Sequence, residues 1–119
     1  MSERILYIDD EVDLLELAAS FFEDENLKIE TCCTFQGALE LIRKNQYDLI
    51  ISDVRMPSGN GHDLMNLIHK EGLFTGKVIM VTGNADEGND PRHRVYDLIV
   101  YKPIDFYELI EQVKKVLLK

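Results

Sequence analysis

The sequence has few cysteines, few basic residues and no long apolar run. Its two cysteines, Cys32 and Cys33, are neighbours, so on a strand they point to opposite faces and predict neither a disulfide framework nor a metal site. The 13 Lys and Arg residues stand against 22 Asp and Glu residues, and this formal net charge of −9 argues against a nucleic-acid or membrane surface. No apolar segment approaches the roughly 20 residues of a membrane span. Residues 1–8 are too short and too charged for a signal peptide, so we expect a cytoplasmic protein.

The chain also lacks repeats, low-complexity tracts and linker-like stretches. Its 119 residues, 45% hydrophobic and 29% charged, are enough for one core and show no sign of disorder. We therefore predict a single domain over residues 1–119. His62 and His69 are seven residues apart, and we expect them on the solvated surface rather than in a metal site.

Short apolar runs alternate with segments of helical periodicity. Strands are predicted over residues 4–8, 27–32, 47–51, 77–82 and 97–101. Helices are predicted over residues 12–23, after the cap residue Thr34, over about 60–71, and from residue 105 onward. Such alternation through short loops gives right-handed crossovers between parallel strands. The fold class that follows is α/β, a doubly wound five-stranded parallel sheet.

The spacing of apolar residues predicts which faces turn toward the core. The 27–32 strand alternates apolar and polar residues, as at a half-exposed edge, whereas the 47–51 and 77–82 runs are nearly continuous, as in strands covered on both faces. On the helices, the expected core-facing residues include Leu14, Leu17, Ala18 and Phe21 in the first, and Leu64, Leu67 and Ile68 in the third.

Polar side chains follow the predicted strands at the points where they end: Asp9 and Asp10, Asp53, Thr82, and Lys102. The carboxyl ends of parallel strands meet at one edge of the sheet, which is where ligands of such sheets bind. Taken alone, Asp53 is equally well explained as a turn residue, since Pro57, Gly59 and Gly61 predict a loop after it.

Three carboxylates within about 5 Å of one another would repel by roughly 3 kcal/mol per pair at an effective dielectric constant near 20. A divalent cation removes that repulsion, and a few carboxylate ligands with room for water suit Mg2+. A nucleophilic carboxylate, a cation, a lysine and a hydroxyl donor are the groups that phosphoryl transfer requires. The residues therefore predict an aspartyl phosphate.

In combination, these residues resemble the receiver domain of two-component response regulators, the CheY-like family. The resemblance extends over nearly all of residues 3–118 and rests on Asp9-Asp10-Glu11, Asp53 with Met56-Pro57 and Gly61, Thr82-Gly83, and Lys102-Pro103. It implies a flavodoxin-like strand order of 2-1-3-4-5 and a cis peptide bond between Lys102 and Pro103.

The resemblance implies that Mg2+ is the cofactor and which residues bind it. Asp10 and Asp53 would be ligands of the ion, together with the main-chain carbonyl of Arg55. Asp9 would act on the ion mostly through water.

The resemblance also implies the chemistry at Asp53, the phosphoacceptor. Lys102 would pair with Asp53 and then with a phosphoryl oxygen, while Thr82 would turn inward to hydrogen-bond the phosphoryl group. Slow hydrolysis of the acyl phosphate would follow. The side chains of Arg55 and Asn84 occupy positions that tune its lifetime in this family.

The implied function is a phosphorylation-activated switch rather than an enzyme, although the domain takes part in its own phosphorylation and dephosphorylation. The phosphoryl donor would be a sensor histidine kinase or a histidine phosphotransfer protein, and the output would be binding of an unidentified downstream protein. We expect no contact of this domain with nucleic acid or membrane. We expect either a stand-alone receiver, with no DNA-binding or catalytic domain after Lys119, or one piece of a longer regulator.

Two features depart from the family pattern. The position three residues before the lysine, commonly Tyr or Phe, is Ile99, and Tyr101 lies next to Lys102 instead. The segment 84–96, where the fourth helix is expected, contains Gly88 and Pro91 and has little apolar periodicity. We predict a shortened or irregular fourth helix beginning near Pro91, or a mobile loop.

Three other classes of function compete with the phosphorylated receiver. A pseudo-receiver, which binds partners without phosphate, remains the alternative because irregular segments often carry binding faces. A phosphatase on the same architecture generally has Asp-x-Asp after the first strand, whereas this chain has Asp9-Asp10-Glu11. A nucleotide or flavin site would need a Gly-rich or Ser/Thr-rich phosphate loop after the first strand, which the sequence lacks.

Overall fold

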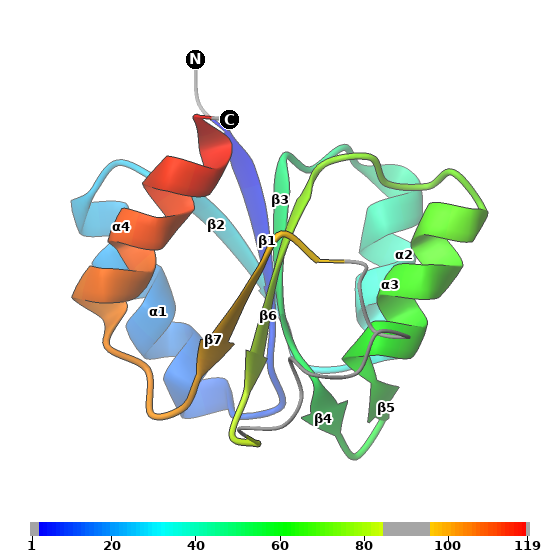
Figure 1. Cartoon of the computed structure of the whole chain (residues 1–119), viewed down its shortest axis with the longest axis horizontal. Coiled ribbons are helices and arrows are strands. Elements are labelled where there is room, and N and C mark those ends of the chain that lie inside the picture. Colours follow the sequence, from blue (N-terminus) through cyan, green and yellow to red (C-terminus); the bar gives the residue numbers. More distant parts are fainter. Residues whose placement is uncertain (1–2, 85–95, 119) are drawn as a thin grey trace.

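The computed structural model describes residues 3–84 and 96–118 as a parallel sheet between two layers of helices (Figure 1). The sheet has the order β2-β1-β3-β6-β7, formed by β1 (Arg4–Ile8), β2 (Lys28–Cys32), β3 (Leu49–Asp53), β6 (Lys77–Thr82) and β7 (Leu98–Tyr101). The helices of the described part are α1 (Val12–Asp24), α2 (Phe35–Lys44), α3 (Gly61–Lys70) and α4 (Phe106–Leu117). Since β6 and β7 are the fourth and fifth strands of this sheet, the predicted α/β fold and the order 2-1-3-4-5 are confirmed.

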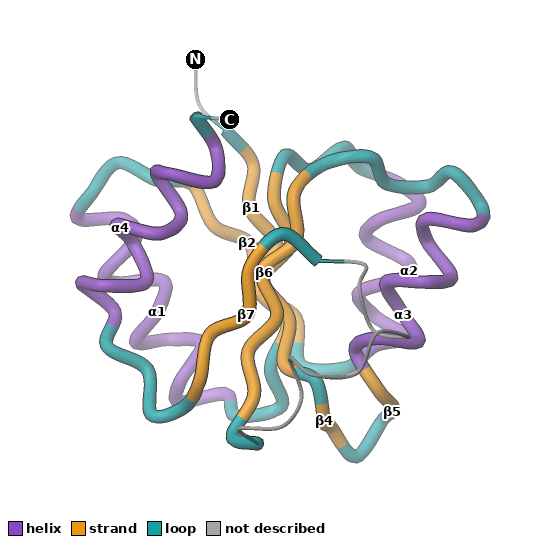
Figure 2. The backbone as a smooth tube through the Cα atoms, viewed as in Figure 1, coloured by secondary structure: helices purple, strands orange, loops and turns teal. Residues whose placement is uncertain are grey.

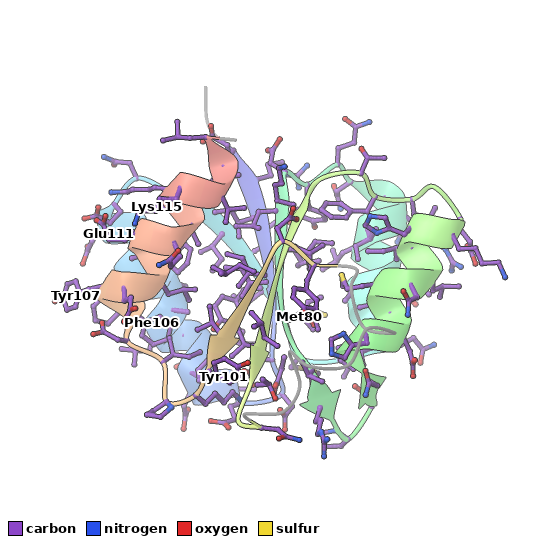
Figure 3. The ribbon with its side chains drawn as sticks, viewed as in Figure 1. Met80, Tyr101, Phe106, Tyr107, Glu111 and Lys115 are labelled. Atoms are coloured by element: carbon purple, nitrogen blue, oxygen red, sulfur yellow. The ribbon has the colours of Figure 1, made fainter. Side chains whose placement is uncertain are left out.

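Each face of the sheet is covered by one pair of helices, with α1 and α4 on one side and α2 and α3 on the other (Figures 1 and 2). Alternate residues of each strand therefore enter two separate cores. Leu6 and Ile8 of β1 pack on the α2/α3 side with Met65 of α3, whereas Ile5 and Tyr7 pack on the α1/α4 side. In Figure 3, Met80 lies between the sheet and α3.

Side-chain caps fix the starts of three helices. The hydroxyl oxygen of Thr34 accepts a hydrogen bond from the main-chain N–H of Gly37, and the side chain of Asn60 accepts one from His62. Asp105 accepts two, from Tyr107 and Glu108. The cap predicted at Thr34 is confirmed, and these caps orient α2, α3 and α4 against the sheet.

A small hairpin follows β3 where the sequence predicted only a loop. β4 (Arg55–Met56) pairs antiparallel with β5 (Gly59–Asn60), so that Arg55 lies opposite Asn60. The main-chain N–H of Gly61 then donates to the carbonyl oxygen of Val54 at 2.7 Å. Two-residue strands carry too little periodicity to be recognised in a sequence, and the hairpin returns the chain to the sheet edge at the start of α3.

Some predictions of side-chain orientation were wrong. Leu17 is 51% exposed and Leu67 is 36% exposed, whereas the neighbouring Leu15 is buried. His62 is also buried, with its ring 6.1 Å from that of Tyr96, rather than on the solvated surface. Helical spacing alone does not fix how far the apolar stripe extends around a helix, because that depends on the neighbouring helices.

Four further expectations concern the Lys102–Pro103 peptide bond, the two cysteines, membrane spans and the fourth helix. The peptide bond between Lys102 and Pro103 is cis, as the resemblance implied. Cys32 and Cys33 are free thiols. Within residues 3–84 and 96–118, no helix is long and apolar enough to cross a membrane. The prediction of a shortened or irregular fourth helix falls on residues 85–95, which lie outside the described residues.

Candidate functional site

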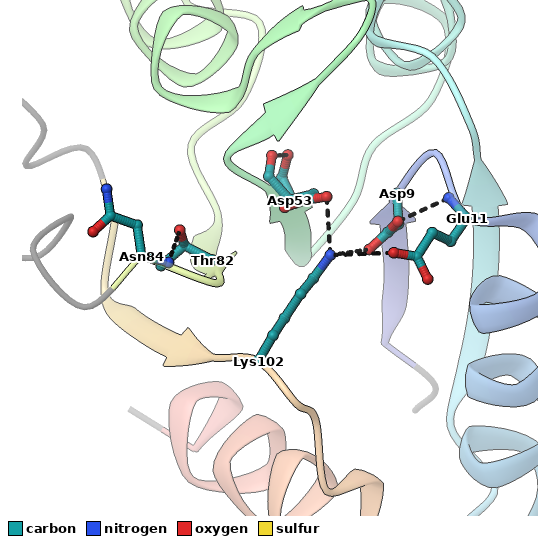
Figure 4. Close-up of polar contacts among 7 residues, drawn as sticks. Asp9, Glu11, Asp53, Thr82, Asn84 and Lys102 are labelled. Atoms are coloured by element: carbon teal, nitrogen blue, oxygen red, sulfur yellow. Dashed lines mark hydrogen bonds and ion pairs between the residues drawn. The ribbon is translucent and has the colours of Figure 1, made fainter.

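The polar residues at the strand ends lie together at one edge of the sheet (Figure 4). Asp9 directly follows β1, Asp53 ends β3, Thr82 ends β6, and Lys102 directly follows β7. In the sheet, β1 is the neighbour of β3 and β3 the neighbour of β6, while the main-chain N–H of Lys102 donates to the carbonyl oxygen of Thr82 at 2.8 Å. The register of the strands thus places side chains that are distant in sequence at a common edge.

The ammonium group of Lys102 links three of the acidic side chains. Its Nζ atom donates a hydrogen bond of 3.2 Å to Oδ2 of Asp53 and lies 3.5 Å from Oδ2 of Asp9. Oε1 of Glu11 lies 3.9 Å away, on a side chain that is 62% exposed. Only a quarter of the Lys102 side chain is exposed, so these charges interact with limited screening by solvent.

Asp9, Asp10 and Asp53 form a cluster in which one carboxylate oxygen of each lies within 4.8 Å of the others. Asp9 and Asp53 are buried, with exposed fractions of 0% and 5%, whereas Asp10 is exposed. Oδ1 of Asp9 accepts a hydrogen bond of 2.9 Å from the main-chain N–H of Glu11. Oδ2 of Asp9 is buried and, within the described residues, accepts no hydrogen bond.

Burial dominates the electrostatics of the two inner carboxylates. It raises the pKa of Asp9, an effect that the hydrogen bond from Glu11 and the charge of Lys102 only partly oppose. Burial also raises the pKa of Asp53 above its ordinary value, against the hydrogen bond and charge of Lys102. For Lys102, burial lowers the pKa, but the carboxylates of Asp53, Asp9 and Glu11 outweigh it and the net shift is upward.

Thr82 is 2% exposed, and its hydroxyl oxygen accepts a hydrogen bond of 3.1 Å from the main-chain N–H of Asn84. In Figure 4 this bond is directed away from Asp53. The hydroxyl therefore takes part in the turn that follows β6.

The close approach of α3 to the site depends on Gly61. A Cβ atom at this position would lie 2.5 Å from the main-chain oxygen of Asp53 and 2.7 Å from Cε of Met80. Any larger residue at position 61 would have to displace main-chain atoms of β3 at Asp53. The sequence included Gly61 in the family motif, and the structure supplies the physical reason.

The donor set fits a small divalent cation. Carboxylate oxygens are hard ligands, and three of them converge within 4.8 Å. Among the described residues, none donates a hydrogen bond to the buried Oδ2 of Asp9. Both inner carboxylates are held near an ammonium group, which is the arrangement expected where negative charge must be compensated. Arg55, from which the resemblance implies a carbonyl ligand, lies two residues after Asp53 at the start of β4.

Two residues near this site were given no role from the sequence. Glu11 was part of the acidic motif, and the structure places it beside Lys102. Tyr7 was assigned only to an apolar strand, although its ring is fully buried and burial, followed by the charges of Asp9 and Asp53, raises the pKa of its hydroxyl. The two-residue period of a strand, which puts Tyr7 on the same face as Asp9, was the available signal.

Comparisons with known proteins agree with this arrangement. The family model described as the response regulator receiver domain matches residues 5–114. The regulatory protein VanR of Enterococcus faecium is 32% identical over 116 residues, which are 96% of this chain and 49% of VanR. The chain thus spans about half the length of the curated relatives it matches.

Solved structures of similar proteins give the same assignment. The response regulator TrrA of Thermotoga maritima, in complex with Mg2+-BeF, is 32% identical with a TM-score of 0.86, and the match covers 96% of this chain and 98% of that one. A CheY-like receiver domain protein of Methanospirillum hungatei is 29% identical with a TM-score of 0.87, covering 98% and 94%. The chain belongs to the response regulator receiver domains of two-component systems.

Proposed function

We propose that this domain is a phosphorylation-activated switch in which Asp53 accepts a phosphoryl group from a phosphohistidine. The donor is a sensor histidine kinase or a histidine phosphotransfer protein, as expected for a member of this family. The observation that carries the proposal is the position of Asp53, a buried carboxylate at the end of a central strand that is hydrogen-bonded to Lys102 beside two further carboxylates.

The proposed reaction is a displacement at phosphorus. A carboxylate oxygen of Asp53 attacks the phosphorus in line, the new P–O bond forms as the P–N bond of the phosphohistidine breaks, and the imidazole nitrogen keeps that electron pair. The products are an acyl phosphate and a free histidine side chain. Lys102 already contacts Asp53 at 3.2 Å, and its charge stabilises the phosphoryl oxygens as they approach.

Asp10 and Asp53 would bind Mg2+ with the main-chain carbonyl of Arg55, while Asp9 would act through water. When bound, the ion neutralises charge on the carboxylates and on the incoming phosphoryl group. The acidic cluster supports this assignment, as does the buried Oδ2 of Asp9, which accepts no hydrogen bond from the described residues. The complex of the similar protein TrrA with Mg2+-BeF supports it as well.

Thr82 would couple phosphorylation of Asp53 to a change in the protein-binding surface. Its hydroxyl now bonds the main chain at Asn84 and would turn to the phosphoryl group once Asp53 is modified. β7 lies next to β6 and pairs Tyr101 with Thr82, so a shift at Thr82 reaches the surface formed by β7 and α4. An unidentified downstream protein would bind there, and neither nucleic acid nor membrane would be contacted by this domain.

The boundaries of the domain and its location in the cell stay predictions. We treat residues 1–119 as one receiver domain in the cytoplasm that catalyses no reaction on other molecules, apart from its share in its own phosphorylation and dephosphorylation. Because VanR is about twice as long as this chain, the activity of a whole regulator containing this domain is likewise a proposal.

The chemistry of the linkage tests this proposal. After incubation with acetyl phosphate labelled on phosphorus and Mg2+, we expect protein-bound label that hydroxylamine releases, as it does from an acyl phosphate. Borohydride reduction of the phosphorylated protein should convert residue 53 to homoserine and release the phosphate. Label that resists hydroxylamine, or homoserine at another aspartate, would contradict the assignment of Asp53. A protein that takes up no label under any donor would favour the pseudo-receiver alternative.

A further inference from the structure

Tyr7 carries a polar atom that the proposed chemistry does not use. Its side chain is fully buried in β1, and its hydroxyl has no hydrogen-bond partner within the described residues. The ring itself is well accommodated, since it packs edge-on against Phe22 with the centroids 6.4 Å apart. A phenylalanine would satisfy that packing, so the hydroxyl needs another explanation.

The second buried side-chain oxygen without a hydrogen bond among the described residues is Oδ2 of Asp9, which forms an ion pair with Nζ of Lys102 at 3.5 Å. Tyr7 lies in β1 and Asp9 directly follows this strand, with its main-chain N–H still donating to the carbonyl oxygen of Cys32 in β2 at 3.1 Å. The two side chains therefore leave the same face of the sheet. Burial is the main cause that raises the pKa of the Tyr7 hydroxyl, and the negative charges of Asp9 and then of Asp53 raise it further.

These two atoms have complementary hydrogen-bonding needs. A phenol hydroxyl can donate one hydrogen bond, and a carboxylate oxygen can only accept. The two side chains do not hydrogen-bond directly, and a single water molecule that accepts from the phenol and donates to the carboxylate would satisfy both. The main-chain N–H of Glu11 already holds the other oxygen of Asp9.

We propose that Tyr7 is a positioning residue of the acidic site: its buried hydroxyl holds Oδ2 of Asp9 through one water molecule and so fixes this carboxylate toward Mg2+. This inference rests on the metal site of the proposed function. Groups that hydrogen-bond a carboxylate beside a metal fix its orientation, and their loss typically weakens metal binding by about 10-fold to 100-fold.

The test compares two substitutions that each remove one buried phenol oxygen. Tyr7→Phe removes the proposed contact. Tyr47→Phe is the matched control, because Tyr47 is also buried but donates its 3.0 Å hydrogen bond to Glu30. Mg2+ binding to the unsubstituted protein and to both variants is measured by calorimetry, and the tyrosine difference absorbance on adding Mg2+ is recorded in parallel.

We expect Tyr7→Phe to weaken Mg2+ binding about tenfold and to abolish the Mg2+-dependent tyrosine difference signal, with Tyr47→Phe unchanged in both. A Tyr7→Phe protein that binds Mg2+ with unaltered affinity and keeps the signal would overturn the role of Tyr7 and leave the metal site intact. If the unsubstituted protein binds no Mg2+, the metal site and the role of Tyr7 are both overturned.

NMR of the unsubstituted protein gives a second test that needs no variant. The Tyr7 hydroxyl proton should give a slowly exchanging resonance that Mg2+ shifts. A rapidly exchanging hydroxyl proton would contradict the inference.

Discussion

Lys102, directly after β7, donates a 3.2 Å hydrogen bond to Oδ2 of Asp53, the last residue of β3. β6 lies between these two strands in the sheet, so the lysine side chain reaches across a neighbouring strand end to the central carboxylate. Its ammonium group also lies 3.5 Å from Oδ2 of the buried Asp9 carboxylate. One cation thus partly compensates two buried negative charges, which makes it central both to stability and to the proposed chemistry.

Lys102→Met should destabilise the metal-free protein by about 2 kcal/mol, because the hydrogen bond to a charged group is lost and two buried carboxylates remain uncompensated. Added Mg2+ should restore part of this loss, while phosphorylation from acetyl phosphate stays impaired. Urea denaturation with and without Mg2+ measures the change in stability.

Lys114→Met is the control, since Lys114 forms a 2.6 Å ion pair with Glu25 in which both side chains are 44% exposed. Its removal should leave stability nearly unchanged, and an equal loss in the two variants would contradict the account.

The raised pKa values of Asp9 and Asp53 predict a pH dependence in the metal-free protein. A carboxyl group whose pKa in the folded protein lies above its ordinary value of 3.8 binds protons more readily when folded. Its contribution to stability is fully present below pH 3.8 and is lost as the pH rises through the raised pKa. We therefore expect Asp53→Asn to raise the melting temperature in EDTA by several degrees at pH 7 and by much less near pH 4.

Differential scanning calorimetry of the unsubstituted protein and of Asp53→Asn across pH 4–8 gives this comparison. Saturating Mg2+ should reduce or reverse the advantage of the variant at pH 7, because the ion stabilises only a folded protein that binds it. A gap between the two melting temperatures that is independent of pH would show that burial of charge at Asp53 is not the cause.

Gly61→Ala should destabilise the protein by roughly 1–3 kcal/mol, because the new methyl group would lie 2.5 Å from the main-chain oxygen of Asp53. The displaced strand end should also slow phosphorylation. Gly83→Ala is the control, since a Cβ atom there meets nothing within 4 Å, and a stability change within about 0.5 kcal/mol is expected. Equal unfolding midpoints for the two variants in urea would be inconsistent with close packing at Gly61.

Leu15 and Leu17 provide a matched pair on α1. Leu15 is 5% exposed and Leu17 is 51% exposed, so Leu15→Ala should cost about 2–4 kcal/mol, whereas Leu17→Ala should cost well under 1 kcal/mol. The free energies of unfolding of the two variants decide between this structure and the sequence pattern, which favoured Leu17 as a core residue. A larger loss for Leu17→Ala would support the pattern.

The same pair shows where sequence reasoning ends in the fold. The alternation of strands and helices and the position of Asp53 at a strand end follow from local periodicity, and the strand order followed from the family resemblance. The direction of Leu17, the burial of His62 and the β4–β5 hairpin depend on how distant segments pack, and no local pattern contains that information. The half-exposed edge strand β2 could be predicted from its own alternation of apolar and polar residues, whereas the boundary between the buried and exposed faces of α1 could not.

In the site, the sequence placed Asp9, Asp53, Thr82 and Lys102 at one edge because parallel strands end together. It did not indicate that the Thr82 hydroxyl bonds Asn84, since a side-chain rotamer is set by the turn it joins. The sequence pattern predicts Tyr7 only as a core residue, because an aromatic residue in a buried strand usually belongs to the core. Whether its hydroxyl finds a hydrogen-bond partner depends on tertiary contacts that the local sequence does not contain.

Intact mass after incubation with acetyl phosphate and Mg2+ tests the central claim most directly. The account predicts a gain of one phosphoryl group that is lost without Mg2+ and in Asp53→Asn, and retained in Asp13→Asn, a matched change at an exposed position of α1. A gain that persists in Asp53→Asn would contradict the assignment of Asp53 as the phosphoacceptor.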